Sequence, residues 1–336
     1  MNKVNIGING FGRIGRTLFR LLNSHPHLNV VAINDLADAR TLAHLLKYDS
    51  IHGVWHKEII ADDGFFHVED QKITVSNQNS PKHIPWSDNK VDIVIEATGK
   101  FKTREDLQYH ILGGAKKVIL SMPPIDDSIK MIVFGINEGS IKTTDNIISN
   151  ASCTTNNAAP MIKVINELCG IEQAYITTIH SYTTDQSLHD QPHKDLRRAR
   201  AASQSIIPTT TGAAKALTKI FPDLANVIGG CGIRVPVPNG SLTDITLNVK
   251  RKTSIQEIND TFEKASQNEL KNILFYTKDP IVSIDINNSC YSCTFDSQMT
   301  SVIGKMVKII GWYDNETGYS SRIIDMINLL VNKKFV

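Results

Sequence analysis

The feature that most constrains this chain is a glycine cluster placed between an apolar run and an amphipathic segment. Residues 3–8, "KVNIGI", are apolar and β-branched, and the cluster "GFGRIG" follows at 10–15 with GxGxxG spacing. Residues 13–22 then repeat apolar side chains at helical spacing, and "VVAIND" at 30–35 is again typical of a strand. The order strand, glycine turn, helix, strand predicts a βαβ unit.

In that context the glycines predict a dinucleotide site. Gly10 and Gly12 would let the backbone approach a pyrophosphate, and the helix N-terminus would offer free N–H groups. Asp35 ends the second strand, where a carboxylate accepts hydrogen bonds from an adenosine ribose and repels a 2′-phosphate. We therefore expect NAD rather than NADP, and the alternative is a tight turn with only a structural role.

Further apolar runs predict the rest of two domains, the natural expectation for 336 residues. Helical or polar segments separate the first set of runs, which favours a Rossmann-type doubly wound parallel sheet of the α/β class. These runs are residues 91–99, 116–121, 131–137 and 146–149. The second set is longer and partly alternating, and it predicts an α+β domain with a mixed or antiparallel sheet. These runs are residues 174–180, 241–250, 281–286 and 305–314. Residues 320–334 read as an amphipathic helix with Ile323, Ile327 and Leu330 on one face.

Composition excludes several classes of protein. Lys and Arg number 36 against 34 Asp and Glu, so no global basic field argues for nucleic acid. We find neither a signal-peptide core nor a membrane-spanning apolar run, and five scattered cysteines do not suggest a disulfide framework. We expect a cytoplasmic protein with free thiols. We expect no metal: Cys290 and Cys293 have no second pair nearby, and Pro192 breaks the helix that would align His189 with His193.

The stretch "NASCTTNN", residues 150–157, places a thiol among hydroxyls just before a helical run. Ser152 or a neighbouring hydroxyl can cap that helix, and the helix dipole lowers the pKa of a thiol at its N-terminus. Packing alone would prefer Ala or Val at this position, so Cys153 is a candidate nucleophile. His180 ends a strand and precedes a polar run, which makes it the candidate base, with simple solvent exposure as the alternative.

Hydroxyl and cationic groups downstream are candidate anion ligands. Arg supplies a bidentate fork and Thr a small donor. These groups are Thr183, "RRAR" at 197–200, "TTTG" at 209–212 and Arg234.

With these residues placed, the chain resembles phosphorylating glyceraldehyde-3-phosphate dehydrogenases over nearly its whole length. The motifs in order are "INGFGRIGR", "NASCTTN", "TTIHSYTTDQ", "RRARAASQSIIPTTTGAAKA", "RVPVPN" and "WYDNETGYS". The resemblance implies that Cys153 attacks the aldehyde of glyceraldehyde 3-phosphate and that His180 is its base. A hemithioacetal, hydride loss to NAD, and a thioester cleaved by inorganic phosphate would follow.

The resemblance also implies binding roles, position by position. Substrate phosphate would be bound by Thr183, Asp185 and Arg234, helped by Arg198. Inorganic phosphate would be bound by Ser152, Thr154, Thr211 and Gly212. NAD would contact Arg13, Ile14, Asp35, Ser121 and Asn315, with Thr98 and Gly99 lining the same cleft beside the glycine turn.

The implied domains are residues 1–152 with 315–336 for NAD, and residues 153–314 for catalysis. The resemblance further implies a homotetramer in which a long loop, about 181–208, reaches a neighbour's cofactor site. Three positions depart from common members of the family: Gln78 near the adenine end, Asn157 in place of a second cysteine, and Gln191 near the adenosine. Gln191 makes the preference for NAD less secure than Asp35 alone suggests.

Two other functions compete. An erythrose-4-phosphate dehydrogenase would lose the Thr-Gly phosphate cradle, whereas this chain keeps "TTTGAAKA" at 209–216. A thiol redox sensor or binding protein would give a burst of NADH without sustained turnover.

Overall fold

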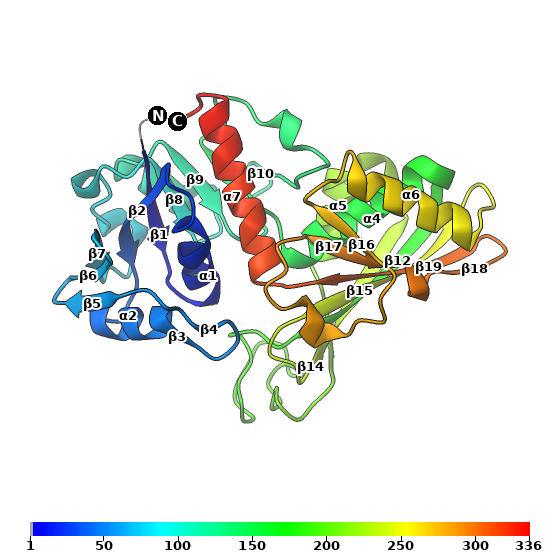
Figure 1. Ribbon diagram of the computed structural model, residues 1–336, viewed down its shortest axis with the longest axis horizontal. Coiled ribbons are helices and arrows are strands. Elements are labelled where there is room, and N and C mark those ends of the chain that lie inside the picture. The colour runs from blue at the N-terminus through cyan, green and yellow to red at the C-terminus, as the bar shows by residue number, and fades with distance from the viewer. Residues whose placement is uncertain (1–2) are drawn as a thin grey trace. The chain divides into compact units, whose positions relative to one another are not determined.

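The computed structural model describes residues 3–336, which form two compact units (Figure 1). Unit 1 comprises the described residues up to Ile132, with Glu138–Ala151 and Ser320–Val336, and unit 2 comprises Val133–Asn137 and Ser152–Tyr319. The domain boundaries that we expect from the sequence, 1–152 with 315–336 and 153–314, stay a prediction. Among the described residues, no helix has both the length and the apolar character that crossing a membrane requires.

The main sheet of unit 1 has nine strands in the order β10-β11-β9-β8-β1-β2-β7-β6-β5. Its strands are parallel from β10 to β7, whereas β6 pairs antiparallel with both β7 and β5. The bounds are β1 Val4–Asn9, β2 Leu28–Asn34, β5 Ile59–Asp62, β6 Phe65–Val68, β7 Gln71–Ser76, β8 Ile93–Glu96, β9 Lys117–Leu120, β10 Lys130–Met131 and β11 Ile147–Ser149. A separate small ladder pairs β3 Tyr48–Asp49 with β4 Gly53–Val54.

Helices of unit 1 join these strands into the doubly wound arrangement. They are α1 Arg13–Leu22, α2 Ala39–Lys47, α3 Arg104–Leu112 and most of α7 Thr317–Asn332, with short 3-10 turns η1 Pro81–His83, η2 Ser87–Asn89 and η3 Glu138–Ser140. The central strands β1, β8 and β9 are buried along nearly their whole length, as expected for a sheet covered on both faces. In α7, the predicted apolar face of Ile323, Ile327 and Leu330 is fully buried.

Unit 2 contains an eight-stranded mixed sheet. Its main path is β13-β14-β12-β15-β19-β17-β16, and β18 pairs with β19. The bounds are β12 Ile171–Ser181, β13 Ile207–Thr209, β14 Ile228–Val235, β15 Ser241–Val249, β16 Leu274–Thr277, β17 Cys293–Asp296, β18 Ser301–Ile303 and β19 Met306–Tyr313. The helices are α4 Cys153–Cys169, α5 Ala213–Ile220 and α6 Ile255–Gln267, with η4 Pro222–Leu224, η5 Ser283–Ile286 and η6 Ser297–Met299. The prediction of a doubly wound parallel sheet and a second, mixed sheet is confirmed, except that the first sheet ends in the antiparallel strands β6 and β5.

Some predicted elements were wrong. Residues 281–286 do not form a strand, and 283–286 form a 3-10 turn instead. Val282 and Ile284 are 56% and 64% exposed, so the alternation of this run does not build a buried face. Only the start of 131–137 extends a strand, in β10. The glycine-rich strand β14 was not predicted, because "IGGCGIRV" lacks the β-branched side chains that signal a strand.

Candidate active site

Cys153 is the first residue of α4. Ser152 precedes it in extended conformation, and the Ser152 hydroxyl oxygen accepts a hydrogen bond from the Thr155 amide at 3.0 Å. This side-chain cap fixes the start of the helix, because it satisfies an N–H that has no partner within the helix. The prediction that the thiol lies at a capped helix N-terminus is confirmed.

His180 lies near the end of β12 and brings its ring to the thiol. Nε2 of His180 is 3.4 Å from Sγ of Cys153, a hydrogen-bond distance for sulfur. His180 is buried, with 5% of the residue's surface exposed, so the solvent-exposed alternative is excluded. The structure therefore places together the two groups that the sequence predicted as nucleophile and base.

Arg234 completes the arrangement from the neighbouring strand. It faces His180 across the parallel pair β12 and β14, and its Nη1 lies 2.8 Å from Nδ1 of His180. The same Nη1 donates to the Ser181 carbonyl at 2.9 Å, and that carbonyl oxygen is 2.7 Å from Nδ1. Strand register thus holds a guanidinium directly against the candidate base.

Burial dominates the protonation of both groups. Burial lowers the pKa of His180 to about 3, and the positive charge of Arg234 acts in the same direction. Burial raises the pKa of the Cys153 thiol, against the lowering effects of Arg234 and of the backbone N–H of Thr154. The expected lowering of the thiol pKa by the helix N-terminus is therefore overcome by desolvation. These shifts favour a neutral thiol beside a neutral imidazole.

Tyr313 was missed by the sequence reasoning, although it stands in the "WYDNE" motif. Its buried hydroxyl is 2.9 Å from the Thr154 hydroxyl and 2.8 Å from that of Thr178. Its ring lies edge-on to the His180 ring, with centroids 5.9 Å apart. A tyrosine that ends an apolar strand was the available signal. In the structure it links α4 to β12 and packs against the base.

Three predicted substrate-phosphate ligands in the loop after β12 contact one another. The Thr183 hydroxyl donates to Asp185, and Asp185 forms an ion pair with Arg198 at 2.8 Å. Arg198 also donates through Nε to the Thr209 hydroxyl at 2.9 Å, which ties the loop to β13. This cluster has both cationic and hydroxyl donors, as recognition of a phosphate requires.

The predicted inorganic-phosphate ligands divide between two helix starts. Ser152 and Thr154 belong to α4, while Thr211 and Gly212 precede α5. The Thr211 hydroxyl oxygen accepts a hydrogen bond from the Ala213 amide at 3.2 Å, and Gly212 provides no side-chain cap. Helices α4 and α5 pack against each other within unit 2. Their N-terminal N–H groups are suited to an anion.

Asn315 is oriented by two serine hydroxyls. Its Oδ1 accepts hydrogen bonds from Ser181 and Ser241, each at 2.9 Å. Because the oxygen is used in this way, the amide NH₂ group has a defined direction. Asn157, the departure from common family members, is buried and donates to the Ser292 and Trp312 carbonyls, both at 3.2 Å. It therefore serves packing in this chain.

In unit 1 the edge formed by the carboxyl ends of β1 and β2 fits a dinucleotide. Gly10 has a φ of +92°, and a Cβ there would lie 2.6 Å from the Thr98 nitrogen. Gly12 precedes α1 with no side-chain cap, and the first turn of α1 contains no acidic residue. Asp35 accepts a hydrogen bond from the Phe11 amide at 2.7 Å, which holds its carboxylate beside the turn. An uncapped helix start beside a glycine turn suits a pyrophosphate.

The remaining predicted cofactor residues of unit 1 lie at or near this edge. Arg13 forms a bidentate ion pair with Asp49, at 2.5 and 3.1 Å, and Ile14 follows it in α1. Burial alone would raise the pKa of Asp49, but Arg13 and two backbone N–H groups hold that pKa well below its usual range. Thr98 and Gly99 lie in the loop after β8. Ser121 follows β9, and its amide donates to the Glu96 carbonyl at 3.0 Å.

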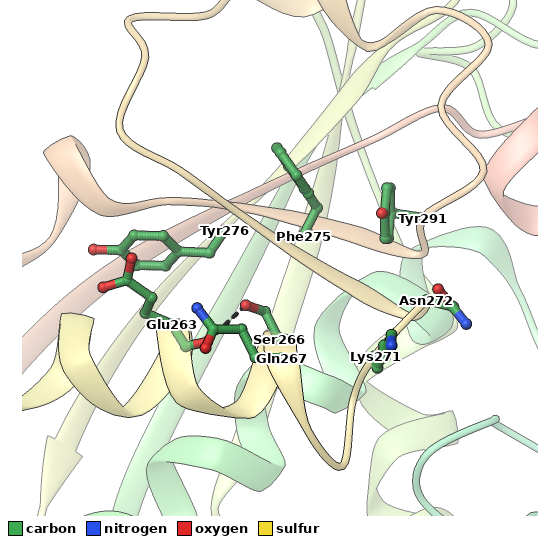
Figure 2. Close-up of a pocket in the computed structure, with 8 residues that line it drawn as sticks. All are labelled: Glu263, Ser266, Gln267, Lys271, Asn272, Phe275, Tyr276 and Tyr291. Atoms are coloured by element: carbon green, nitrogen blue, oxygen red, sulfur yellow. Dashed lines mark hydrogen bonds between the residues drawn. The ribbon is translucent and has the colours of Figure 1, made fainter.

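A hollow of about 460 Å³ in unit 2 contains none of these groups (Figure 2). It lies beside α6 and β16 and is lined by Glu263, Ser266, Gln267, Lys271, Asn272, Phe275, Tyr276 and Tyr291. The Phe275 and Tyr291 rings lie 5.2 Å apart, in contact with each other. The active-site assignment therefore depends on the convergence of reactive groups rather than on the size of a hollow.

Comparisons with known proteins agree with this arrangement. Residues 4–104 match the model of the NAD binding domain of glyceraldehyde 3-phosphate dehydrogenase, and residues 152–315 match that of its C-terminal domain. The chain is 48% identical over 332 residues to glyceraldehyde-3-phosphate dehydrogenase of Geobacillus stearothermophilus, covering 98% of this chain and 99% of the relative. It is 51% identical over 333 residues to glyceraldehyde-3-phosphate dehydrogenase 2 of Streptomyces avermitilis, with the same coverage. It is 47% identical over 330 residues to glyceraldehyde-3-phosphate dehydrogenase 1 of Bacillus cereus, covering 98% of both. The chain therefore belongs to the glyceraldehyde-3-phosphate dehydrogenase family and has its NAD-binding domain.

Proposed function

We propose that this chain oxidises D-glyceraldehyde 3-phosphate to 1,3-bisphosphoglycerate, with NAD as oxidant and inorganic phosphate as acyl acceptor. The observation that carries the proposal is the 3.4 Å contact between Sγ of Cys153 and Nε2 of His180, with Arg234 against the far side of the ring. The names of the relatives support the choice of aldehyde.

The pair generates the nucleophile when the aldehyde arrives. Nε2 of His180 takes the thiol proton, and Sγ of Cys153 adds to the aldehyde carbon to give a hemithioacetal. The protonated ring donates its proton to the new oxyanion to give the hemithioacetal hydroxyl, and Nε2 takes that proton back as hydride leaves and the carbonyl re-forms. NAD, when bound, supplies the hydride acceptor. The thioester left on Cys153 keeps the acyl group activated for phosphate attack.

Two anion sites serve this sequence. Arg234, with Thr183 and the Asp185–Arg198 ion pair, binds the phosphate of the substrate. Ser152, Thr154, Thr211 and Gly212 bind the attacking inorganic phosphate at the starts of α4 and α5. Their donors are small hydroxyls and backbone N–H groups, which hold an anion without adding bulk near the thioester.

For the cofactor, the glycine turn, Arg13 and Ile14 receive the pyrophosphate, and Asp35 receives the adenosine ribose. Ser121 and Thr98 line the same edge. Asn315, whose oxygen is already engaged by two serines, uses its amide NH₂ group to orient the nicotinamide carboxamide.

The chain acts as a cytoplasmic homotetramer. The loop between β12 and β13 supports this assembly, because Leu188, Leu196 and Ile206 are 68%, 81% and 71% exposed in the single chain. A second copy that covers this loop would remove those apolar side chains from water. Sedimentation equilibrium of the purified chain tests the assembly, and a monomer at micromolar concentration contradicts it.

Oxidation of erythrose 4-phosphate is the weaker candidate, because the threonines of 209–211 keep a hydroxyl cradle beside α5. The decisive assay pairs each aldehyde with NAD or NADP, with and without inorganic phosphate. We expect sustained turnover only with glyceraldehyde 3-phosphate, NAD and phosphate together. Turnover that is indifferent to phosphate, with erythrose 4-phosphate the better substrate, contradicts the proposal. A single burst of NADH without turnover identifies a thiol sensor instead.

A further inference from the structure

Four neighbouring parallel strands of unit 1 end in polar side chains that are hydrogen-bonded in a row. Glu96 of β8 is opposite Asn9 of β1, Asn9 is opposite Asn34 of β2, and Asn34 is opposite Ser76 of β7. Asn9 Nδ2 donates to Glu96 Oε2 at 2.5 Å, Asn34 Nδ2 to Asn9 Oδ1 at 2.9 Å, and Ser76 Oγ to Asn34 Oδ1 at 2.9 Å. We call Glu96, Asn9, Asn34 and Ser76 the polar row. The loops that follow β8, β1 and β2 begin directly after Glu96, Asn9 and Asn34, at the edge of the sheet to which we assign the cofactor.

Backbone groups fix the direction of the row at one end. Asn34 Oδ1 accepts from the Gln78 amide at 2.8 Å, and Asn34 Nδ2 donates to the Gln78 carbonyl at 2.9 Å. The side-chain amide of Asn34 therefore has only one orientation, and it turns the oxygen of Asn9 towards itself. Asn9 is left to present its N–H groups to Glu96.

A tryptophan fixes the direction at the other end. The indole N–H of Trp86 donates to Nδ1 of His110 at 2.9 Å, and both side chains are buried. Because an indole nitrogen can only donate, Nδ1 of His110 must accept, and the ring carries its proton on Nε2. Nε2 is 3.1 Å from Glu96 Oε2, so His110 donates to that oxygen.

Both oxygens of Glu96 must therefore be acceptors. Oε2 receives Asn9 and His110, while Oε1 receives the Thr98 amide at 2.8 Å and the Thr98 hydroxyl at 2.5 Å. A glutamine at position 96 would point its NH₂ group either at the N–H groups of Asn9 and His110 or at the backbone N–H of Thr98, and these N–H groups cannot accept. The position accepts a carboxylate and rejects its isosteric amide.

We infer that Glu96, held by His110 and Trp86, is a positioning residue for the dinucleotide. Its carboxylate accepts hydrogen bonds from the backbone amide and from the hydroxyl of Thr98. The Thr98 nitrogen in turn lies close to the glycine turn, where a Cβ on Gly10 would approach it to 2.6 Å. A displaced Thr98 therefore enters the space that the turn needs for the pyrophosphate. The inference rests on the proposed assignment of this edge to NAD.

The test is Glu96→Gln in the full chain, with the dissociation constant for NAD measured by calorimetry. We expect that constant to rise about tenfold, since one buried N–H loses its partner. Alkylation of Cys153 by iodoacetamide without NAD should keep its wild-type rate, because the thiol belongs to unit 2. Glu69→Gln, at an exposed ion pair of unit 1, is the matched control and should change neither readout.

Val94→Ala separates positioning from general destabilisation, because Val94 is fully buried in β8. It should lower the melting temperature while leaving the affinity for NAD unchanged. If Val94→Ala weakens NAD as much as Glu96→Gln, or if Glu96→Gln folds and binds NAD as the wild type does, the inference is wrong.

If Glu96→Gln does not fold, Trp86→Phe provides the second measurement. It removes the indole donor that keeps the proton of His110 on Nε2, and we expect NAD to bind roughly threefold more weakly. Unchanged affinity there overturns the inference. Failure of the cofactor edge itself is distinguishable, because then Asp35→Ala would also leave NAD binding unchanged.

Discussion

His110 in unit 1 and His180 in unit 2 are both buried, yet their neighbours differ in whether they fix which ring nitrogen carries the proton. At His110 the Trp86 indole can only donate and Glu96 can only accept, so the ring has a single tautomer. At His180 the same Nδ1 lies 2.7 Å from the Ser181 carbonyl oxygen, which can only accept, and 2.8 Å from the Arg234 guanidinium, which can only donate. It cannot serve both partners at once.

That difference leaves the second histidine able to change its protonation at Nε2. When Nδ1 donates to the Ser181 carbonyl, Nε2 is free to accept the Cys153 proton. When Arg234 donates to Nδ1, Nε2 carries a proton towards the sulfur. A site that only binds is best served by one fixed pattern of donors, whereas general acid–base catalysis needs a group that can hold the proton in two places.

The largest effect that tests this contrast is the loss of the thiol. Cys153→Ser should lower turnover at least about 10³-fold, because a hydroxyl is a far poorer nucleophile near neutral pH. NAD should still bind as to the wild type, since the polar row is intact. Cys290→Ser, at an exposed thiol, is the control and should keep full activity. Residual turnover near the wild-type level would remove Cys153 from the chemistry.

The two anion sites should separate in a pre-steady-state experiment. Arg234→Leu removes a charge-assisted contact, so the KM of the aldehyde should rise about 10- to 150-fold and the NADH burst should slow. Thr211→Ala should raise the KM of phosphate and slow acyl release while leaving the burst normal, because phosphate enters after the thioester forms. Equal slowing of the burst in both variants would contradict two separate sites.

In unit 1, Asp35→Ala should relax discrimination against NADP by about tenfold, because the carboxylate that repels a 2′-phosphate is gone. The comparison is the ratio of kcat/KM for NAD and NADP. An unchanged ratio would assign the preference to the loop near Gln191.

The smallest expected effect concerns stability and pH. The folded pKa of His180 is about 3 and its unfolded pKa is about 6.5, so the unfolded chain binds more protons between these values. Stability is therefore lost as pH falls through this window, by about 1 kcal/mol from this residue between pH 7 and 5.5. Urea unfolding of unit 2 should show a shallower pH dependence for His180→Gln. Parallel curves for variant and wild type would contradict the buried neutral ring.

Several features could be predicted from the sequence because they depend on neighbours along the chain. The helix α1 begins and ends where the apolar spacing indicated, at Arg13 and Leu22. The capped start of α4 followed from Ser152 and the helical run after it. The family motifs then implied His180 as the base of the thiol and Arg234 as a ligand of the substrate phosphate, whereas the contact of Arg234 with His180 came only from the structure. The prediction for 281–286 was wrong because alternation does not show whether a face is covered, and here it is exposed.

By itself the sequence determined the glycine turn, the thiol at a helix start and the order of the two domains, since local backbone preferences encode each of them. Only the tertiary structure decided which polar groups meet. Tyr313 reaches Thr154 and Thr178 across 159 and 135 residues, and Glu96 reaches Asn9 across 87. Such contacts depend on strand register, because a shift of one residue would turn the side chains of a strand to the opposite face of its sheet. The proton patterns of His110 and His180 follow from these contacts, which no local spacing specifies.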